Sequence, residues 1–318
     1  MKKLVYGLLI LLAAGIAGTV ATAGAAGGFN FNAKEVFDEK VISNKEIKNI
    51  EVALSSADLT FHQTSDEDIK VELNGKVNKK YKDRFQLEVE EKGNTLEIAL
   101  SGEDRLEFNF GINIVDKNVD VYLPERVFDK IHGKSSSGDI KGTDMQAKEE
   151  VVLNSNSGDV ALEHSKSAER MMLKTSSGDI QSLKNSTEDF ELKTNSGDLT
   201  IRDQQGKETV LDTSSGDITI SEALGNLKAD SSSGDILIEN SELTGNIDAE
   251  ATSGEISIEF DKEPSSMEID FNGGSGEGTV ELEGLSYEEK SEDEIKGKIG
   301  SGKYKLKVRT HSGDFELR

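Results

Sequence analysis

Carboxylates at regular intervals are the side chains of this sequence whose type and spacing could do chemistry. The motif Ser-Gly-Asp recurs through the second half of the chain, and an acid follows nearly every one of its glycines. Carboxylate oxygens are hard ligands that suit calcium, so these acids become calcium candidates if successive motifs stack. The candidates are Asp159, Asp179, Asp198, Asp217 and Asp235, and Asp139 and Glu255 extend the same series.

Plain turn chemistry is the favoured explanation of these acids. Neighbouring coils of a stacked structure lie about 4.8 Å apart, and two like charges at that distance repel by about 0.9 kcal/mol in water. Hydrogen bonds from backbone N–H groups or serine hydroxyls at the turn would offset this repulsion. A calcium-binding β-roll also needs a period of about nine residues with more glycines, which this sequence lacks.

The remaining reactive side chains form no catalytic or metal-ligating pattern. His62, His132, His164 and His311 are scattered without ligand spacing. The serine before each motif glycine has no histidine at a fixed offset, so it indicates a packed corner rather than a nucleophile. The chain has 0 Cys, which excludes thiolate catalysis and disulfides. We expect no cofactor and no enzyme activity; a polysaccharide-acting β-helix enzyme is an alternative that only fold analogy supports.

The motif is the corner of a repeat of about nineteen residues. Its glycines, from Gly138 to Gly254, follow one another at intervals of 18–20 residues. Apolar residues alternate with polar ones on both sides of each corner, which predicts strands with one buried face. The predicted structural turn residues are Ser157 and Gly158, Ser177 and Gly178, Ser196 and Gly197, Ser215 and Gly216, Ser233 and Gly234, and Ser253 and Gly254.

This repeat pattern predicts an all-β fold, a single-domain parallel β-solenoid (β-helix) of ~19-residue coils. A long meander of hairpins is the alternative, because Gly-Asp between alternating strands is also a hairpin signal. Stacked coils are favoured since they explain why every corner is chemically alike and why the repeat length is nearly constant.

Five segments organise the chain. Residues 1–28 are expected to be a signal peptide or transmembrane anchor, and residues 29–48 a stalk. Residues 49–133 form irregular β coils without the motif, and residues 134–260 form the regular solenoid. Residues 261–318 form further coils that contain an acidic loop, YEEKSEDE at 287–294, and a closing copy of the motif.

The first segment predicts export from the cytoplasm. Lys2 and Lys3 precede an apolar stretch, and no further charge occurs until Lys34. Cleavage after Ala23 would release a secreted chain, whereas residues 4–26 are also long enough to span a membrane. We expect retention as a single-pass anchor with the rest of the chain extracytoplasmic.

Charge adds two expectations. The chain carries 37 Lys and Arg against 61 Asp and Glu, a net charge of −24, which argues against nucleic acid as a partner. A locally cationic strand is expected to form the exposed final edge of the solenoid, where its charges would block pairing with other edges. Its cations are Lys303, Lys305, Lys307 and Arg309, and an anion site for wall teichoic acid or lipid headgroups is the alternative role.

Several segments together resemble the LiaG-like family of bacterial envelope proteins. They are IKNIEVALSSADLTF, VDVYLPE, the serial SSGDI corners and YKLKVRTHSGDFEL. The family is labelled a "putative adhesin" and otherwise a domain of unknown function. The resemblance implies a β-solenoid on the outer side of a bacterial membrane, often anchored at its N-terminus. The expected function is non-catalytic, adhesin-like binding or scaffolding in the cell envelope, with an envelope polymer or a membrane protein as partner. Regulation of a cell-envelope stress response is the alternative.

Overall fold

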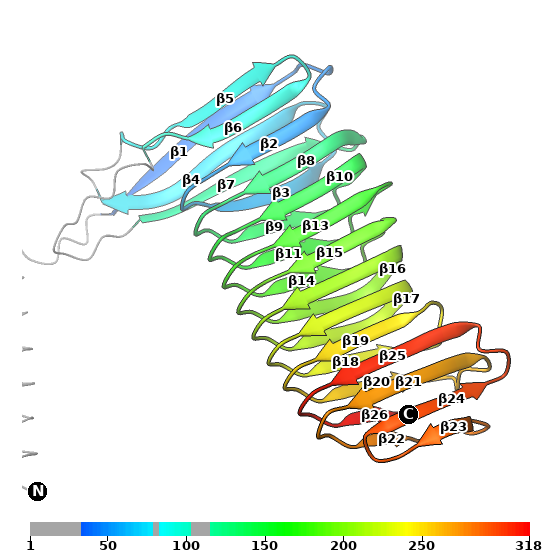
Figure 1. Ribbon diagram of the computed structural model, residues 1–318. Coiled ribbons are helices and arrows are strands. Elements are labelled where there is room, and N and C mark those ends of the chain that lie inside the picture. Colours follow the sequence, from blue (N-terminus) through cyan, green and yellow to red (C-terminus); the bar gives the residue numbers. More distant parts are fainter. Residues whose placement is uncertain (1–32, 79–82, 103–114) are drawn as a thin grey trace, which may run out of the picture.

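The computed structural model describes residues 33–78, 83–102 and 115–318, and every element within these ranges is a β-strand. The prediction of an all-β fold is therefore confirmed. The strands stack into a long, solenoid-like rod (Figure 1). Each coil contributes a strand to each of two long faces, which we call face A and face B, and the apolar core lies between them.

Face A contains the strands that lead into each motif corner. Its order along the rod is β5 (Leu87–Lys92), β6 (Thr95–Leu100), β2 (Asn49–Ala53), β8 (Phe128–Lys134), β10 (Gln146–Asn154), β13 (Arg170–Lys174), β15 (Asp189–Lys193), the second halves of β16 (Leu199–Thr213) and β17 (Ile218–Ser231), β19 (Ile247–Ala251), β25 (Tyr304–Thr310), β21 (Met267–Gly273), β24 (Glu294–Ile299) and β23 (Ser286–Lys290).

Face B contains the strands that leave each corner. Its order is β1 (Ala33–Ile42), β4 (Ile69–Asn78), β7 (Val115–Pro124), β3 (Asp58–Thr64), β9 (Ile140–Thr143), β11 (Val160–Glu163), β14 (Ile180–Leu183), the first halves of β16 and β17, β18 (Ile236–Asn240), β20 (Ile256–Phe260), β26 (Phe315–Leu317) and β22 (Gly278–Val280). A short strand, β12 (Lys166–Ser167), pairs with the start of β10 on a narrow third side.

Pairing is parallel along the body of the rod and antiparallel only near its ends. The antiparallel pairs are β1–β4, β4–β7, β5–β6, β21–β24 and β23–β24. In the body, residues seven and five positions before each motif glycine are buried, as the alternating pattern predicts. A second corner returns the chain from face B, and in five coils its residue has a left-handed φ of 52–56°.

The segment expected to be a stalk is partly a strand of the sheet. Residues 33–42 form β1, which pairs along its whole length with β4. Val36 and Ile42 are buried against the core, whereas Asp38 and Lys40 occupy the positions between them on the same face. These two charges interrupt the apolar alternation, so the sequence pattern did not predict a strand here. β1 covers the backbone of β4, which would otherwise be an open edge.

The order of the strands departs from the order of the chain near residue 318. β25 lies between β19 and β21 on face A, and β26 lies between β20 and β22 on face B. Figure 1 shows the resulting red coil between a yellow coil and an orange one. The cationic strand is therefore hydrogen-bonded on both sides, and the prediction that it forms the final edge is wrong.

The acidic run at 287–294 is not a simple loop. Its first half belongs to β23, which pairs antiparallel with β24 although all five of its residues are exposed. Lys296 on β24 forms ion pairs with Glu289 at 3.3 Å and with Glu294. A cation between two acids lets this acidic segment pair as a strand.

Within the described ranges, no helix is long and apolar enough to cross a membrane. Residues 1–28, on which the expected signal peptide or anchor depends, lie outside those ranges.

Candidate functional site

The corner acids form a continuous column, and the donors that hold them come from the next coil. The Asp159 N–H donates to Asp139 Oδ1 at 2.9 Å, and the Asp179 N–H donates to Asp159 Oδ1 at the same distance. The contact repeats, at 2.8–2.9 Å, at Asp198, Asp217, Asp235 and Glu255. A charge-assisted hydrogen bond to each aspartate from Asp139 to Asp235 offsets repulsion along the column.

The column begins at Asp58, in the irregular coil before the motif repeats. Asp58 accepts the Asp139 N–H at 2.9 Å. Burial raises the pKa of the Asp58 carboxyl, the Asp139 N–H acts in the opposite direction, and the negative charges of Asp139 and Asp116 raise it further. The segment SSADLTF therefore supplies a true corner without the glycine.

The calcium candidates use one carboxylate oxygen for this backbone contact and are exposed to solvent. Among the residues that the structure describes, no group of three or more His, Cys, Asp or Glu side chains could hold a metal ion. Calcium binding by Asp159, Asp179, Asp198, Asp217 and Asp235 stays a prediction from the sequence.

Most corners also contain a buried hydroxyl three residues before the glycine. The sequence pattern did not predict a role for it. Ser155 Oγ accepts the Gly158 N–H at 3.0 Å and donates to the Gly138 carbonyl at 2.9 Å. Thr175, Thr194, Thr213 and Ser231 donate in the same way to the glycine carbonyl of the preceding coil. The position suggested only a small residue, yet five hydroxyls in a row were a signal for a buried hydrogen-bond ladder.

Glycine is required because successive corners touch through their backbones. A Cβ added to Gly197 would lie 1.9 Å from the Gly178 carbonyl oxygen, and the distance at the other motif glycines from 138 to 254 is 1.9–2.2 Å. The serine that follows the buried hydroxyl by two positions is exposed instead. Ser157, Ser177, Ser196, Ser215, Ser233 and Ser253 form an outward row of hydroxyls along the rod.

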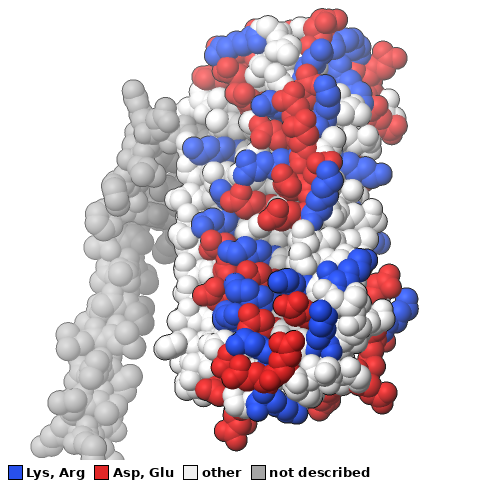
Figure 2. Space-filling view, turned by 45° about the vertical axis from the view of Figure 1, so that its right-hand side comes forward, with Lys and Arg blue, Asp and Glu red and all other residues white. Residues whose placement is uncertain are grey.

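Face A carries a ladder of ion pairs between coils. Arg170 and Lys174 both contact Glu191, at 2.7 and 2.9 Å. Burial opposes ionisation of Glu191, but hydrogen bonds from Lys174 and Arg170 outweigh it and hold the pKa of this carboxyl below its ordinary value. Figure 2 shows basic and acidic side chains intermingled along the length of the molecule. Other pairs join Lys130 to Glu150, Lys193 to Asp212 and Lys307 to Asp248.

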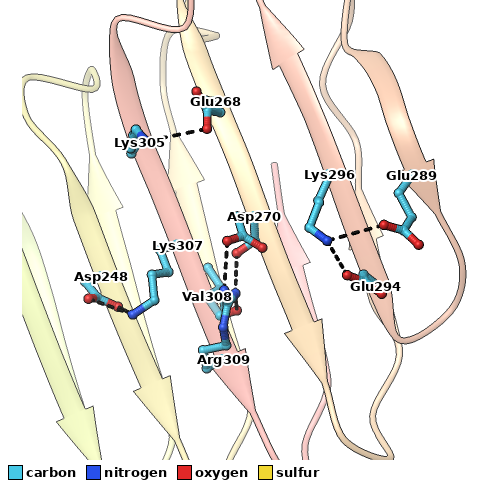
Figure 3. Close-up of polar contacts among 10 residues, drawn as sticks. All are labelled: Asp248, Glu268, Asp270, Glu289, Glu294, Lys296, Lys305, Lys307, Val308 and Arg309. Atoms are coloured by element: carbon cyan, nitrogen blue, oxygen red, sulfur yellow. Dashed lines mark hydrogen bonds and ion pairs between the residues drawn. The ribbon is translucent and has the colours of Figure 1, made fainter.

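The cations of β25 belong to this ladder. Lys307 contacts Asp248 on β19 at 2.9 Å, and Arg309 contacts Asp270 on β21 at 2.8 Å (Figure 3). Lys305 lies 3.6 Å from Glu268 on β21, while the ammonium of Lys303, which precedes β25, lies 4.3 Å from the centroid of the Tyr304 ring. Acids of the two flanking strands thus face three of the four cations.

The four histidines lie at separate places in the structure. His62 contacts Asp120 at 3.1 Å and stacks on Tyr122, and His132 contacts Glu150 at 3.0 Å. His164 occupies the left-handed second corner, and the carbonyl of His311 accepts the Ser275 N–H. The structure brings no two of them together.

Comparison with solved structures finds the same fold at low identity. A protein from Parabacteroides distasonis ATCC 8503 described as a "putative lipid binding protein" is 15% identical, with a TM-score of 0.54; the match covers 91% of this chain and 98% of that one. A "putative adhesin" from the same strain is 14% identical, with a TM-score of 0.51, and the match covers 88% of this chain and 96% of that one.

No curated protein matches the chain. The Toastrack family, DUF4097, matches residues 47–318, which include every motif corner and both faces of the rod. The chain therefore belongs to the Toastrack family, DUF4097.

Proposed function

We propose that this chain is a non-catalytic, adhesin-like module that binds or scaffolds polymers of the bacterial cell envelope. The observation that carries this proposal is the register of the stacked coils. Parallel pairing places one outward side chain per coil in straight rows along the rod. Rigid rows of this kind suit an extended, repetitive partner, as the long surfaces of other repeat proteins do.

The names of similar structures support the same proposal. One is described as an adhesin and the other as a lipid-binding protein, both with the qualifier quoted above. Binding rather than catalysis is the role that both names suggest. The LiaG-like resemblance adds a location at the outer face of a bacterial membrane.

We further propose that residues 1–28 keep the chain in the membrane as a single-pass anchor. Lys2 and Lys3 would remain in the cytoplasm, and the apolar stretch that follows is long enough to span the bilayer. The intact mass of the chain from a membrane fraction tests this. Retention predicts the full-length mass, whereas a mature chain that begins at Gly24 would show cleavage and secretion.

Crosslinking in cells, followed by purification of the tagged full-length chain, tests the function. Recovery of wall polymers supports the adhesin-like role. Recovery of a membrane protein of a sensor system, without polymer, would instead favour the LiaG-like regulator of envelope stress. Cleavage of a cell-wall or pectic polysaccharide by the purified chain would contradict a non-catalytic role and support the β-helix enzyme.

A further inference from the structure

A polar groove of about 530 Å³ runs along the rod between the end of face A and the motif corner. One wall carries Lys134, Lys174 and Lys193, the last outward residues of β8, β13 and β15. The lining also includes Asn156 and Asn195 of the corners. Lys134, Asn154, Lys174 and Lys193 occupy equivalent positions in four successive coils, so the groove is parallel to the rod axis and Asn154 interrupts its row of lysines.

The charged side chains that line this groove are all positive, whereas the net charge of the whole chain is negative. No carboxylate lines the groove, although the net charge of the chain is −24. Lys174 and Lys193 contact Glu191 and Asp212 at 2.9 and 2.8 Å outside the groove lining. Lys134 has no ion-pair partner within the described ranges, and the residues that pair with it in register, Ala53 and Asn154, carry no charge.

The sign of the charge changes where the groove ends. The position of Lys193 is taken by Asp212, Asp230 and Glu250 in the next three coils, each in register with the residue of the coil before it. The backbone geometry is the same in both stretches, so the lysines are a property of the groove rather than of the repeat.

We propose that this groove binds a linear anionic polymer with hydroxylated units, such as a polyol phosphate. Lysine ammonium groups attract phosphate as point charges, and asparagine amides both donate to and accept from hydroxyls. Coils about 4.8 Å apart present these groups repeatedly along one line, which suits a chain lying in the groove better than a flat bilayer. The proposal names the ligand class of the adhesin-like role and rests on that role.

Titration calorimetry of the purified full-length chain with a poly(glycerol phosphate) oligomer tests the site. The groove variant is Lys134→Gln with Lys174→Gln and Lys193→Gln. Its matched control is Lys141→Gln with Lys148→Gln and Lys166→Gln, which removes the same charge from exposed positions elsewhere. We expect at least a tenfold higher Kd for the groove variant and less than a twofold change for the control, with circular dichroism confirming that both fold.

A second pair of probes tests hydroxyl recognition. Asn156→Ala with Asn195→Ala is expected to weaken binding of poly(glycerol phosphate) but to leave binding of inorganic polyphosphate, which has no hydroxylated units, unchanged. An equal loss with both probes, or no loss with either, would overturn the assignment of the amides.

Three further outcomes would overturn the proposal that the groove is the binding site. They are equal weakening by the groove and control variants, no binding of the oligomer by the wild type, and binding only to vesicles of phosphatidylglycerol and phosphatidylcholine. Failure here, with wall polymers still recovered by crosslinking, would remove this site and leave the adhesin-like role standing. Failure of the crosslinking experiment as well would remove both.

Discussion

Three residues of each corner share the work of stacking one coil on the next. A buried hydroxyl such as Ser155 joins two coils through backbone groups, the glycine lets the two backbones touch, and the acid accepts an N–H from the following coil. The hydroxyl and the acid each satisfy a polar backbone atom that the tight corner would otherwise leave unpaired. The short motif therefore fixes both the turn and the distance between coils.

The backbone contact at the corners predicts a large cost for Gly197→Ala. The new Cβ would lie 1.9 Å from the Gly178 carbonyl oxygen, so the two coils must separate. We expect the free energy of unfolding to fall by about 1–3 kcal/mol or more, measured by urea denaturation. Ser196→Ala, at the exposed neighbouring position, is the control and is expected to change it by less than about 0.5 kcal/mol. Equal effects would contradict the role of the glycine.

The hydroxyl ladder predicts that one substitution is stabilising. Ala251 stands where Ser231 and the equivalent residues of the preceding coils carry a hydroxyl, and it is buried. Ala251→Ser would supply a donor to the Gly234 carbonyl and an acceptor for the Gly254 N–H. We expect the free energy of unfolding to rise by about 0.5–1.5 kcal/mol. The reverse change at an earlier corner, Ser155→Ala, should lower the free energy of unfolding by about 1–3 kcal/mol. A loss of stability in both variants would show that the hydroxyl ladder is misassigned.

At the scale of the strand, position in the sheet decides what the charges of β25 do. An edge strand needs like charges to repel a second edge, but a strand with partners on both sides needs opposite charges across each pairing. β25 meets the second condition, because acids of β19 and β21 face its cations. The cations therefore help to place this strand between two acidic neighbours.

This position predicts that the cations are dispensable for solubility. The variant Lys303→Thr with Lys305→Thr and Lys307→Thr is expected to keep the oligomeric state of the wild type, because the backbone of β25 is already paired on both sides. Its urea midpoint should fall only modestly, since exposed ion pairs contribute about 0.2–1 kcal/mol each. Light scattering after size exclusion measures the first quantity. Self-association of the folded variant would restore the edge assignment.

Local sequence pattern could predict the strands but not their order. Tyr304, Leu306 and Val308 alternate with cations in the same way whether a strand is central or at an edge. Which neighbour it finds depends on partners about 40–60 residues away, and no local pattern encodes that choice. The corners were predictable because they repeat. β1 was not, because Asp38 and Lys40 fill positions that an amphipathic strand gives to apolar residues.

For the molecule as a whole, the ion pairs of face A make stability depend on pH. The folded-state pKa of Glu191 lies below its ordinary value, mainly through Lys174 and Arg170, which outweigh the effect of burial. Such a carboxylate stabilises the fold above the unfolded pKa of about 4.3, and this contribution is lost as the pH falls through the folded-state pKa.

Glu191→Gln should therefore be less sensitive to acid than the wild type. We expect the urea midpoint of the variant to fall less between pH 7 and pH 3.5, because the variant has no carboxylate at this position to protonate. Glu169→Gln, at an exposed position on the preceding coil, is the control and should follow the wild type. If Glu191→Gln also follows the wild type, its pairs with Lys174 and Arg170 do not couple folding to pH.

The coil formed by β25 and β26 lies between coils that precede it in the chain, and this position delays completion of the sheet during synthesis. β21 and β24 are synthesised before β25, yet β25 must lie between β21 and β19. Coils up to β19 and β20 can add one after another as the chain emerges, but β21 cannot join them until residues 304–317 arrive. Ile247 then meets Leu306 at a sequence separation of 59 residues, a closure far slower than the addition of a neighbouring coil. The emerging chain thus keeps this part of its sheet open until the last residues arrive, and that interval is when it is most exposed to proteases and to wrong strand partners.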